Sequence, residues 1–152
     1  MNTKTITAGT LVLVVALLAY VGTSQAANGF SNRSLKGTYG LSGSGTLAGG
    51  AVQAAIVGLN SFDRAGGCRI TARINALATV TPVRSTSCSY TVNPDGTGFI
   101  SVSFDNPMFA GPFRSDIVIV DNAQEIDFML SDDSGGTVAV GVAKRQTSDE
   151  NE

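Results

Sequence analysis

The stretch that decides the fold is Ser89-Tyr90-Thr91-Val92-Asn93-Pro94-Asp95-Gly96-Thr97-Gly98-Phe99-Ile100-Ser101-Val102-Ser103-Phe104. Apolar and polar side chains alternate on both sides of its centre, which is typical of half-buried strands. At the centre, Pro94 sets φ for the first turn position, Asp95 accepts local backbone hydrogen bonds and Gly96 tolerates positive φ. The stretch therefore predicts two antiparallel strands joined by a tight turn.

Segments with the same design lie on both sides of this hairpin, three before it and three after it. The expected strands cover residues 37–45, 51–62, 68–79, 85–92, 98–105, 113–120, 125–131 and 137–145. Between residues 27 and 152 no segment shows a helical period. The sequence thus predicts an all-β domain, an eight-stranded antiparallel up-and-down barrel, because closing a meander removes exposed strand edges. An open β-sandwich is the alternative.

The N-terminal segment, residues 1–26, has the pattern of a secretory signal peptide. Lys4 precedes an apolar run over residues 8–21, and the small residues Ser24 and Ala26 stand before a cut between Ala26 and Ala27. A retained membrane anchor is the alternative, but the run is short for a span, which needs about 20 residues. We expect an exported protein, periplasmic or extracellular, without membrane contact once the signal is removed.

The remaining chain divides into three parts on this interpretation. Residues 27–36 form a polar lead-in segment, residues 37–145 a single barrel domain and residues 146–152 a flexible tail. The sequence does not reveal an oligomeric state.

The two cysteines, Cys68 and Cys88, are expected to form a structural disulfide, since an exported chain meets an oxidising compartment. The apolar stretch between them is expected to turn near residues 79–82, which would place both cysteines on adjacent strands of one hairpin. Closing a loop of about 20 residues stabilises a fold by about 3 kcal/mol in the chain-entropy model.

Composition excludes several functional classes. The chain has no histidine, so it has no Ser-His-Asp or Cys-His pair and no histidine metal ligand. Its formal net charge of -2 does not suggest a nucleic-acid partner. The Asp-Gly turns supply at most two carboxylates each, too few for calcium, which takes six to eight oxygens. We expect no cofactor and no metal.

Two features remain as candidate sites. The loop over residues 106–112 carries Met108 and Phe109, which we expect to tuck over an open end of the core or to line a ligand entrance. Arg114 shares a strand face with Asp116, as Arg69 does with Arg73. These charges would contact a ligand if they faced inward, but outward polar faces are the rule in sheets. The candidate ligand-binding residues are Tyr39, Tyr90, Met108, Phe109, Arg114 and Phe128.

Four segments carry a resemblance to known proteins. These segments, 36–40, 62–67, 90–98 and 141–146, resemble an uncharacterised family of small exported bacterial β-proteins. More loosely, the chain resembles the calycin superfamily, which includes the lipocalins, and the allene oxide cyclase type of barrel. The lipocalin likeness places Gly37-Thr38-Tyr39 at the start of the first strand, with Tyr where that family has Trp. It implies that Lys144 or Arg145 closes the barrel end by placing a cation against the Tyr39 ring.

Three functions follow as hypotheses. The first is a non-enzymatic barrel that binds a small apolar or amphipathic molecule, and it predicts an internal cavity of about 300 Å³ or more. The second is a cyclase or isomerase of the allene oxide cyclase type, which predicts a buried ionisable group in that cavity. The third is a structural or interaction role in the cell envelope, which predicts a filled core and an exposed apolar patch. We expect binding rather than catalysis.

Overall fold

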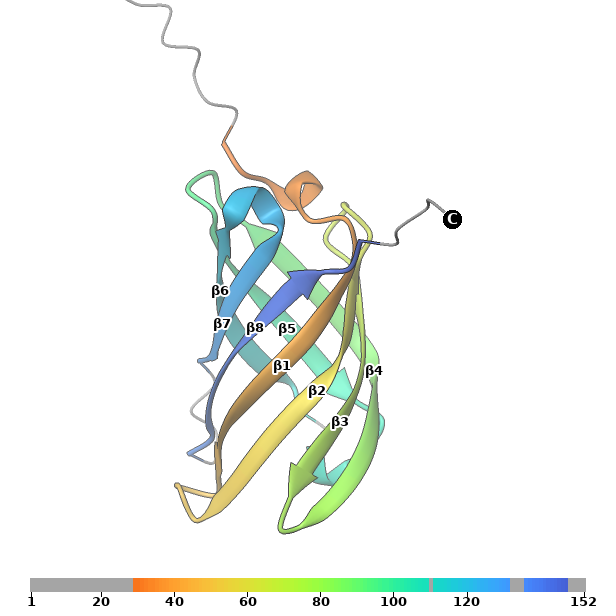
Figure 1. Ribbon diagram of the computed structural model, residues 1–152, viewed down its shortest axis with the longest axis vertical. Helices are drawn as coiled ribbons and strands as arrows, with labels where there is room; N and C mark the ends of the chain where they lie inside the picture. Colours follow the sequence, from red (N-terminus) through yellow and green to blue (C-terminus); the bar gives the residue numbers. More distant parts are fainter. Residues whose placement is uncertain (1–28, 110, 132–135, 148–152) are drawn as a thin grey trace, which may run out of the picture.

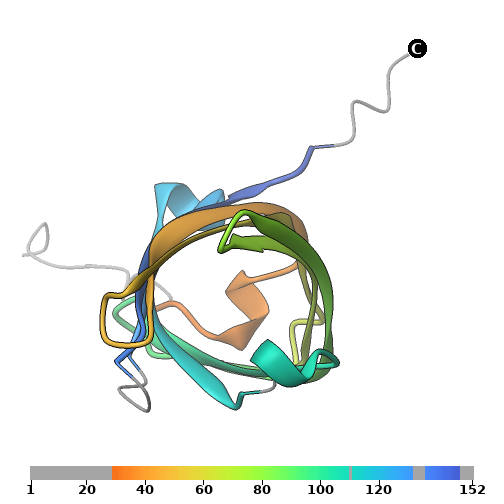
Figure 2. The ribbon, with the colours of Figure 1, turned by 90° about the horizontal axis from the view of Figure 1, so that it is seen from below.

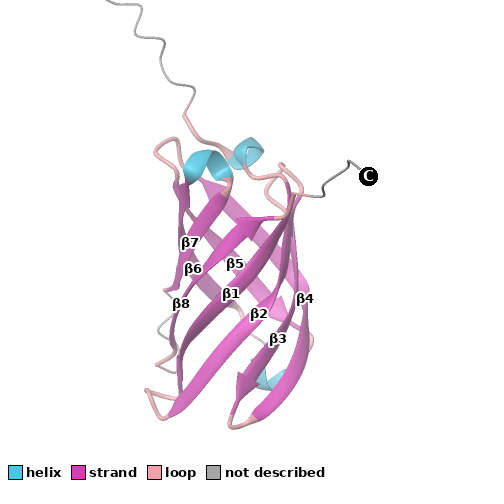
Figure 3. Ribbon diagram, in the orientation of Figure 1, coloured by secondary structure: helices cyan, strands magenta, loops and turns pink. Residues whose placement is uncertain are grey.

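The computed structural model describes residues 29–109, 111–131 and 136–147, and within them the chain forms a closed barrel of eight antiparallel strands in sequential order (Figure 1). The strands are β1 (Gly37–Leu47), β2 (Val52–Phe62), β3 (Cys68–Ala76), β4 (Thr79–Val92), β5 (Thr97–Phe104), β6 (Phe113–Val120), β7 (Glu125–Leu130) and β8 (Val138–Arg145). Three single-turn 3-10 helices accompany them: η1 (Asn32–Ser34), η2 (Pro107–Phe109) and η3 (Asp121–Ala123) (Figure 3). The predicted signal peptide, residues 1–26, lies outside the described residues.

Closure of the barrel comes from the pairing of its first and last strands. β1 and β8 are antiparallel from Tyr39 opposite Arg145 to Thr46 opposite Val138. Every strand thereby has two neighbours, which removes the open edges that a sandwich would retain. The barrel prediction is confirmed, and the β-sandwich alternative is wrong.

The two-residue alternation of side chains along each strand decides which side chains point into the barrel. In β3, for example, Ile70, Ala72 and Ile74 are buried, whereas Arg69 and Arg73 between them are exposed. Successive side chains of a strand point to opposite faces, so this alternation gives an apolar interior and a polar exterior. The interior holds one continuous hydrophobic core.

The central hairpin forms as its sequence predicts. β4 and β5 pair from Val92 opposite Gly98 outward, and the Gly96 amide donates to the Asn93 carbonyl at 3.0 Å. The Asp95 carboxylate accepts hydrogen bonds from the backbone amide and the hydroxyl of Thr97, at 3.0 and 2.7 Å. Gly96 has a φ of +87°, which glycine adopts without strain.

The turn between β3 and β4 differs from the prediction. It lies at Leu77 and Ala78, with φ of 52° and 58°, and the predicted turn segment 79–82 is the start of β4. A two-residue turn with positive φ at both positions usually carries Asn or Gly, and Leu-Ala gives no such signal. Pro82 lies in a part of β4 that pairs with β3 alone, since pairing with β5 begins at Ser85, and a proline is tolerated there.

The predicted disulfide is present between Cys68 and Cys88, with 5.0 Å between their Cα atoms. It lies between the end of the β3–β4 pairing, at Thr71 opposite Arg84, and an isolated bridge that joins Gly67 to Ser89. In the same part of β4, the register against β5 shifts between Ser85 and Ser87. At this point the Ile70 amide donates to the Ser85 hydroxyl at 3.0 Å instead of to a strand carbonyl. The disulfide therefore joins the two strands in the gap between their regular pairing and the bridge, next to the hydrogen bond from the Tyr90 amide to the Gly66 carbonyl.

Replacing both cysteines by alanine should lower the free energy of unfolding by about 3 kcal/mol, because the unfolded chain regains the freedom of a loop of 20 residues. Urea unfolding of the Cys68→Ala/Cys88→Ala variant, compared with the oxidised wild type, measures the loss. Reduced wild-type protein is the matched control and should show a similar loss. Equal stability of the variant and the oxidised protein would contradict a structural role for the disulfide.

Candidate ligand-binding cavity

One end of the barrel, here called the closed end, is sealed by a layer of three aromatic rings. Tyr39 from β1, Phe62 from β2 and Tyr90 from β4 are all buried. The Phe62 ring makes edge contacts with both tyrosines, with centroids 5.3 and 5.0 Å apart. The Tyr39 hydroxyl donates to the Ala123 carbonyl in η3 at 2.7 Å, which ties this layer to the β6–β7 connection.

The lead-in segment covers the closed end from outside. Figure 2, which looks along the barrel, shows η1 lying across the ring of strands. The Asn32 side-chain oxygen accepts from the Val92 amide at 2.8 Å, and the Asn32 carbonyl accepts from the Tyr90 hydroxyl at 2.9 Å. Leu35 has no exposed surface. The segment thus acts as a plug, a role that its mixed polar sequence did not indicate.

Burial raises the pKa of both Tyr39 and Tyr90, and for Tyr90 the negative charge of Asp63 acts in the same direction. For Tyr39 the positive charge of Arg145 opposes the effect of burial. Because the folded-state pKa lies above the unfolded value, the stability linked to each hydroxyl is complete below pH 10.0 and is lost as pH rises through the folded pKa.

Stability should therefore fall as pH rises beyond 10.0, the ordinary tyrosine pKa, and Tyr39→Phe should reduce the steepness of this fall. At neutral pH the variant should be less stable by about 1 kcal/mol, because the Ala123 carbonyl loses its donor. Thermal unfolding of both proteins over an alkaline pH series measures the effect. The same pH dependence in wild type and variant would contradict a contribution from the Tyr39 hydroxyl.

Between the closed end and the opposite end lies a cavity of about 150 Å³. The side chains that reach it from the inward positions of the strands are mainly apolar, and Asn60 and Ser115 are polar among them. The lining residues are Leu41, Ser44, Gly45, Thr46, Leu47, Ala54, Ala55, Ile56, Asn60, Ile70, Ile74, Ile100, Val102, Phe104, Phe109, Phe113, Ser115, Ile126, Phe128, Leu130, Thr137, Ala139 and Ala143. The cavity is half the size that the sequence led us to expect.

Phe128 forms one wall of the cavity and owes its position to two glycines. Gly43 and Gly141 face each other across the β1–β8 pairing, and the end of the Phe128 ring lies over both. A Cβ atom at Gly141 would overlap this ring, and one at Gly43 would lie 3.0 Å from it. Glycine at both positions therefore leaves room for the end of the Phe128 ring to approach the strands closely.

The opposite end, here called the mouth, carries the described residues of the predicted loop, 106–109 and 111–112. Phe109 is buried and lines the cavity, while Met108 is 71% exposed and lines only the mouth. Of the two expected roles, Phe109 thus takes the first, covering the open end of the core, and Met108 takes the second, lining the entrance. The Phe104 and Phe113 rings, with centroids 6.2 Å apart, line the same cavity as Phe109. About 800 Å³ of space, partly open to solvent, adjoins these residues at the mouth.

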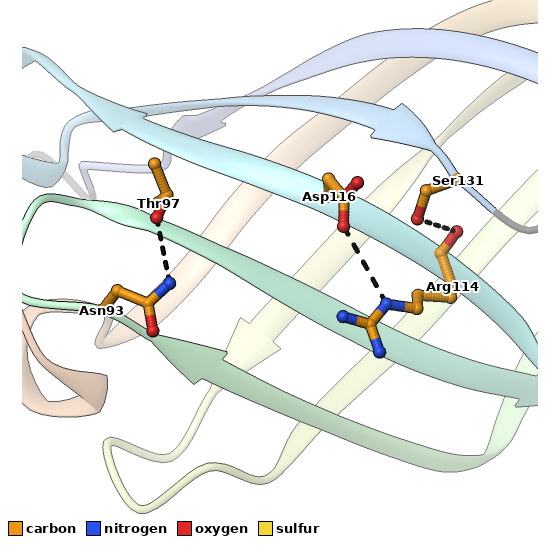
Figure 4. A network of polar contacts seen from close by, with 5 residues as sticks. All are labelled: Asn93, Thr97, Arg114, Asp116 and Ser131. Carbon is orange, nitrogen blue, oxygen red and sulfur yellow. Dashed lines mark hydrogen bonds and ion pairs between the residues drawn. The ribbon is translucent and has the colours of Figure 1, made fainter.

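Arg114, a predicted ligand contact, lies on the outer surface of the barrel (Figure 4). Its guanidinium is 3.9 Å from the Asp116 carboxylate and stacks over the Phe99 ring at 4.0 Å from the centroid. Side-chain alternation in β6 turns Arg114 away from the cavity, to which Ser115 points instead. Arg69 and Arg73 are likewise exposed on β3, which agrees with the outward polar face that the sequence favoured.

The predicted cation on the Tyr39 ring is not among the contacts of the described residues. Lys144 instead donates to the Glu125 carboxylate at 2.8 Å on the outer surface, and this hydrogen bond raises the pKa of Lys144. Arg145 lies opposite Tyr39 in the strand pairing. The ring of Tyr39 is held by Phe62 and by the hydrogen bond of its hydroxyl, so the barrel end is closed without the arrangement that the lipocalin likeness implied.

The structure brings together only part of the predicted site. Phe109 and Phe128 line the cavity, Tyr39 and Tyr90 form the layer that ends it, and Met108 lies at its mouth. Asn60 was missed. It follows Ala54, Ile56 and Gly58 at a period of two along β2, and that period, which places it on the inward face, was the signal available in the sequence.

Uncharged outer surface is concentrated on three adjacent strands. Val57 and Leu59 of β2 and Val138 and Val140 of β8 are each about half exposed, and the outward positions of β1 between them carry small residues. This outer apolar patch meets one expectation of the interaction hypothesis. The cavity does not meet the other, which was a filled core.

Neither a family model nor a curated protein nor a solved structure matches the chain. The fold and the cavity therefore supply the functional evidence. Over residues 29–109, 111–131 and 136–147, no group of acidic or cysteine side chains is arranged to hold a metal ion. Within the same ranges, no helix is both long and apolar enough to cross a bilayer.

Proposed function

We propose that this protein is an exported barrel that binds a small apolar or amphipathic molecule inside its strands. The observation that carries the proposal is the cavity of about 150 Å³, whose inward side chains are almost all aliphatic or aromatic. Ligand sites of this kind combine a concave apolar wall with a small number of polar groups. An eight-stranded barrel is just wide enough to hold one small ligand.

Cavity size limits the ligand. An apolar cavity of about 150 Å³ accommodates a molecule the size of benzene. A longer ligand would have to extend past Phe109 into the mouth, where Leu47, Leu77 and Met108 provide further apolar surface. A polar end group would then reach solvent at the mouth while the apolar part remained inside.

Cavity chemistry favours binding over catalysis. None of the described lining residues carries an ionisable side chain, whereas the cyclase alternative requires at least one. The tyrosines with raised pKa, Tyr39 and Tyr90, already use their hydroxyls to hold the closed end together. The disulfide supports the proposed export, because such bonds persist in oxidising compartments.

Toluene is a suitable probe of the cavity because its size matches the volume. Isothermal titration calorimetry should detect saturable binding to the wild type. In Ala54→Phe, a ring added at an inward position of β2 that lines the cavity should weaken toluene binding by about tenfold or more. The matched control is Gln53→Phe, which adds the same ring to the exposed outer face one residue away and should bind toluene like the wild type.

Absence of binding of both toluene and its hydroxyl analogue phenol to the folded wild type would contradict the proposal. Equal weakening by Ala54→Phe and Gln53→Phe would contradict it too, because binding would then not depend on the interior. Circular dichroism of both variants confirms that the barrel is formed before binding is measured.

A second candidate function, an interaction role in the cell envelope, is favoured by the outer apolar patch over β8, β1 and β2. Exposed apolar surface of this kind marks contacts with other macromolecules. If a second copy of the chain covers the patch, the wild type should sediment as a dimer. The double variant Val57→Lys/Val140→Lys should then sediment as a monomer, and a wild type that is monomeric at all concentrations would contradict self-association.

A further inference from the structure

Asn60 is the polar residue that stands out inside the barrel. Its side chain is 2% exposed, and no other polar or charged residue of the described chain is buried. Its Oδ1 atom has no hydrogen-bond partner, and it is the only buried side-chain oxygen or nitrogen of the described residues without one. A buried amide oxygen without a donor is destabilising, because it has given up its hydrogen bonds to water without replacement. Such a residue therefore calls for a physical explanation.

The Asn60 amide lies at the end of the cavity nearest the closed end of the barrel. Along β2 it is two residues from Phe62 of the aromatic layer and eight residues from Val52 at the mouth end. In the strand pairing its neighbours are Tyr39 and Ile70. Asn60 itself is part of the cavity lining, together with Leu41, Ile70 and Ile100.

Neighbouring donors at the closed end are already used. The Tyr39 hydroxyl donates to Ala123, and the Tyr90 hydroxyl donates to the Asn32 carbonyl. The cavity residues next to Asn60 are aliphatic and offer no donor. A buried water needs two to four polar partners, and such partners are scarce in this part of the lining. Because Asn60 lines the cavity, a molecule in the cavity would lie next to this residue.

We propose that Asn60 recognises an uncharged hydroxyl group on a small apolar ligand. A hydroxyl both donates and accepts, so it pairs with either end of the amide. A charged group is disfavoured because the lining offers no ionisable partner and burial of an unpaired charge is costly. The ligand class is therefore a compact alcohol or phenol with an apolar body. This inference rests on the proposed ligand-binding function and adds the chemical class of the ligand.

Phenol and toluene test the inference because they differ by a hydroxyl in place of a methyl group of similar size. Their dissociation constants are measured by calorimetry for the wild type and for Asn60→Leu, in which a side chain of similar shape replaces the amide. Asn60→Leu should weaken phenol binding by about tenfold while toluene binding is unchanged or stronger. The matched control is Asn75→Leu, the same substitution at an exposed position of β3, which should change neither constant.

A second measurement uses the wild type alone. The side-chain amide resonances of Asn60 should shift when phenol saturates the protein and should shift much less with toluene. Thermal unfolding provides a third readout, since Asn60→Leu should raise the melting temperature of the ligand-free protein by removing the unpaired amide.

Each outcome is decisive. The inference is wrong if the phenol-to-toluene affinity ratio is the same in the wild type and in Asn60→Leu. It is also wrong if the Asn60 amide resonances respond equally to both probes. In either case the proposed ligand binding itself still holds. These two results are expected if a water molecule, instead of the ligand hydroxyl, is the hydrogen-bond partner of Asn60. If neither probe binds the wild type, the proposed function fails as well. A phenol-specific loss in Asn60→Leu, together with unchanged binding in Asn75→Leu, supports the inference.

Discussion

Pairing of β1 with β8 is the constraint on which the rest of the structure depends. Once these strands close the barrel, each inward side chain must share a lumen whose width is set by eight strands. Small residues stand at inward positions on both sides of this seam, among them Gly43 and Gly141, which face each other. They leave the volume that Phe128 partly fills and that the cavity occupies.

The two ends of the barrel differ: hydrogen bonds close one end, and the other end is lined mainly by apolar side chains. At the closed end, backbone and side-chain hydrogen bonds from Asn32, Tyr39 and Tyr90 hold the plug and the aromatic layer in place. At the mouth, the described lining is mainly apolar, with Thr137 as its polar side chain, and Phe109 belongs to the hydrophobic core. A ligand entering at the mouth would therefore pass apolar side chains first and reach Asn60 last.

Local sequence signals were enough to predict the fold. Alternation of apolar and polar residues defined the strands, and Asp95-Gly96 defined the central turn, because both features report backbone conformation directly. The β3–β4 turn was misplaced because Leu77 and Ala78 adopt positive φ without the usual residues. The disulfide could be inferred from two cysteines, but not its position across the irregularity in β4.

The site was less predictable because it depends on which inward positions meet in space. Phe109 and Phe128 were identified as large apolar residues. Arg114 was also placed among the candidates, but it precedes the inward-facing Ser115 by one residue, and the alternation of side chains along β6 therefore places it on the outer surface. Asn60 belongs to no sequence motif. Its lack of a hydrogen-bond partner becomes visible only in the structure, where Tyr39 and Ile70 are its strand neighbours and Ile100 lines the same cavity. Cavity volume, likewise, depends on the packing of the whole barrel.

Diffraction from crystals pressurised with xenon tests the central claim, which is that the barrel encloses an accessible apolar cavity. Xenon enters dry cavities lined by aliphatic and aromatic side chains. We expect a strong xenon peak inside the barrel, bordered by Ile56, Ile100 and Phe128. An interior filled by side chains, with no xenon between the aromatic layer and the mouth, would contradict it.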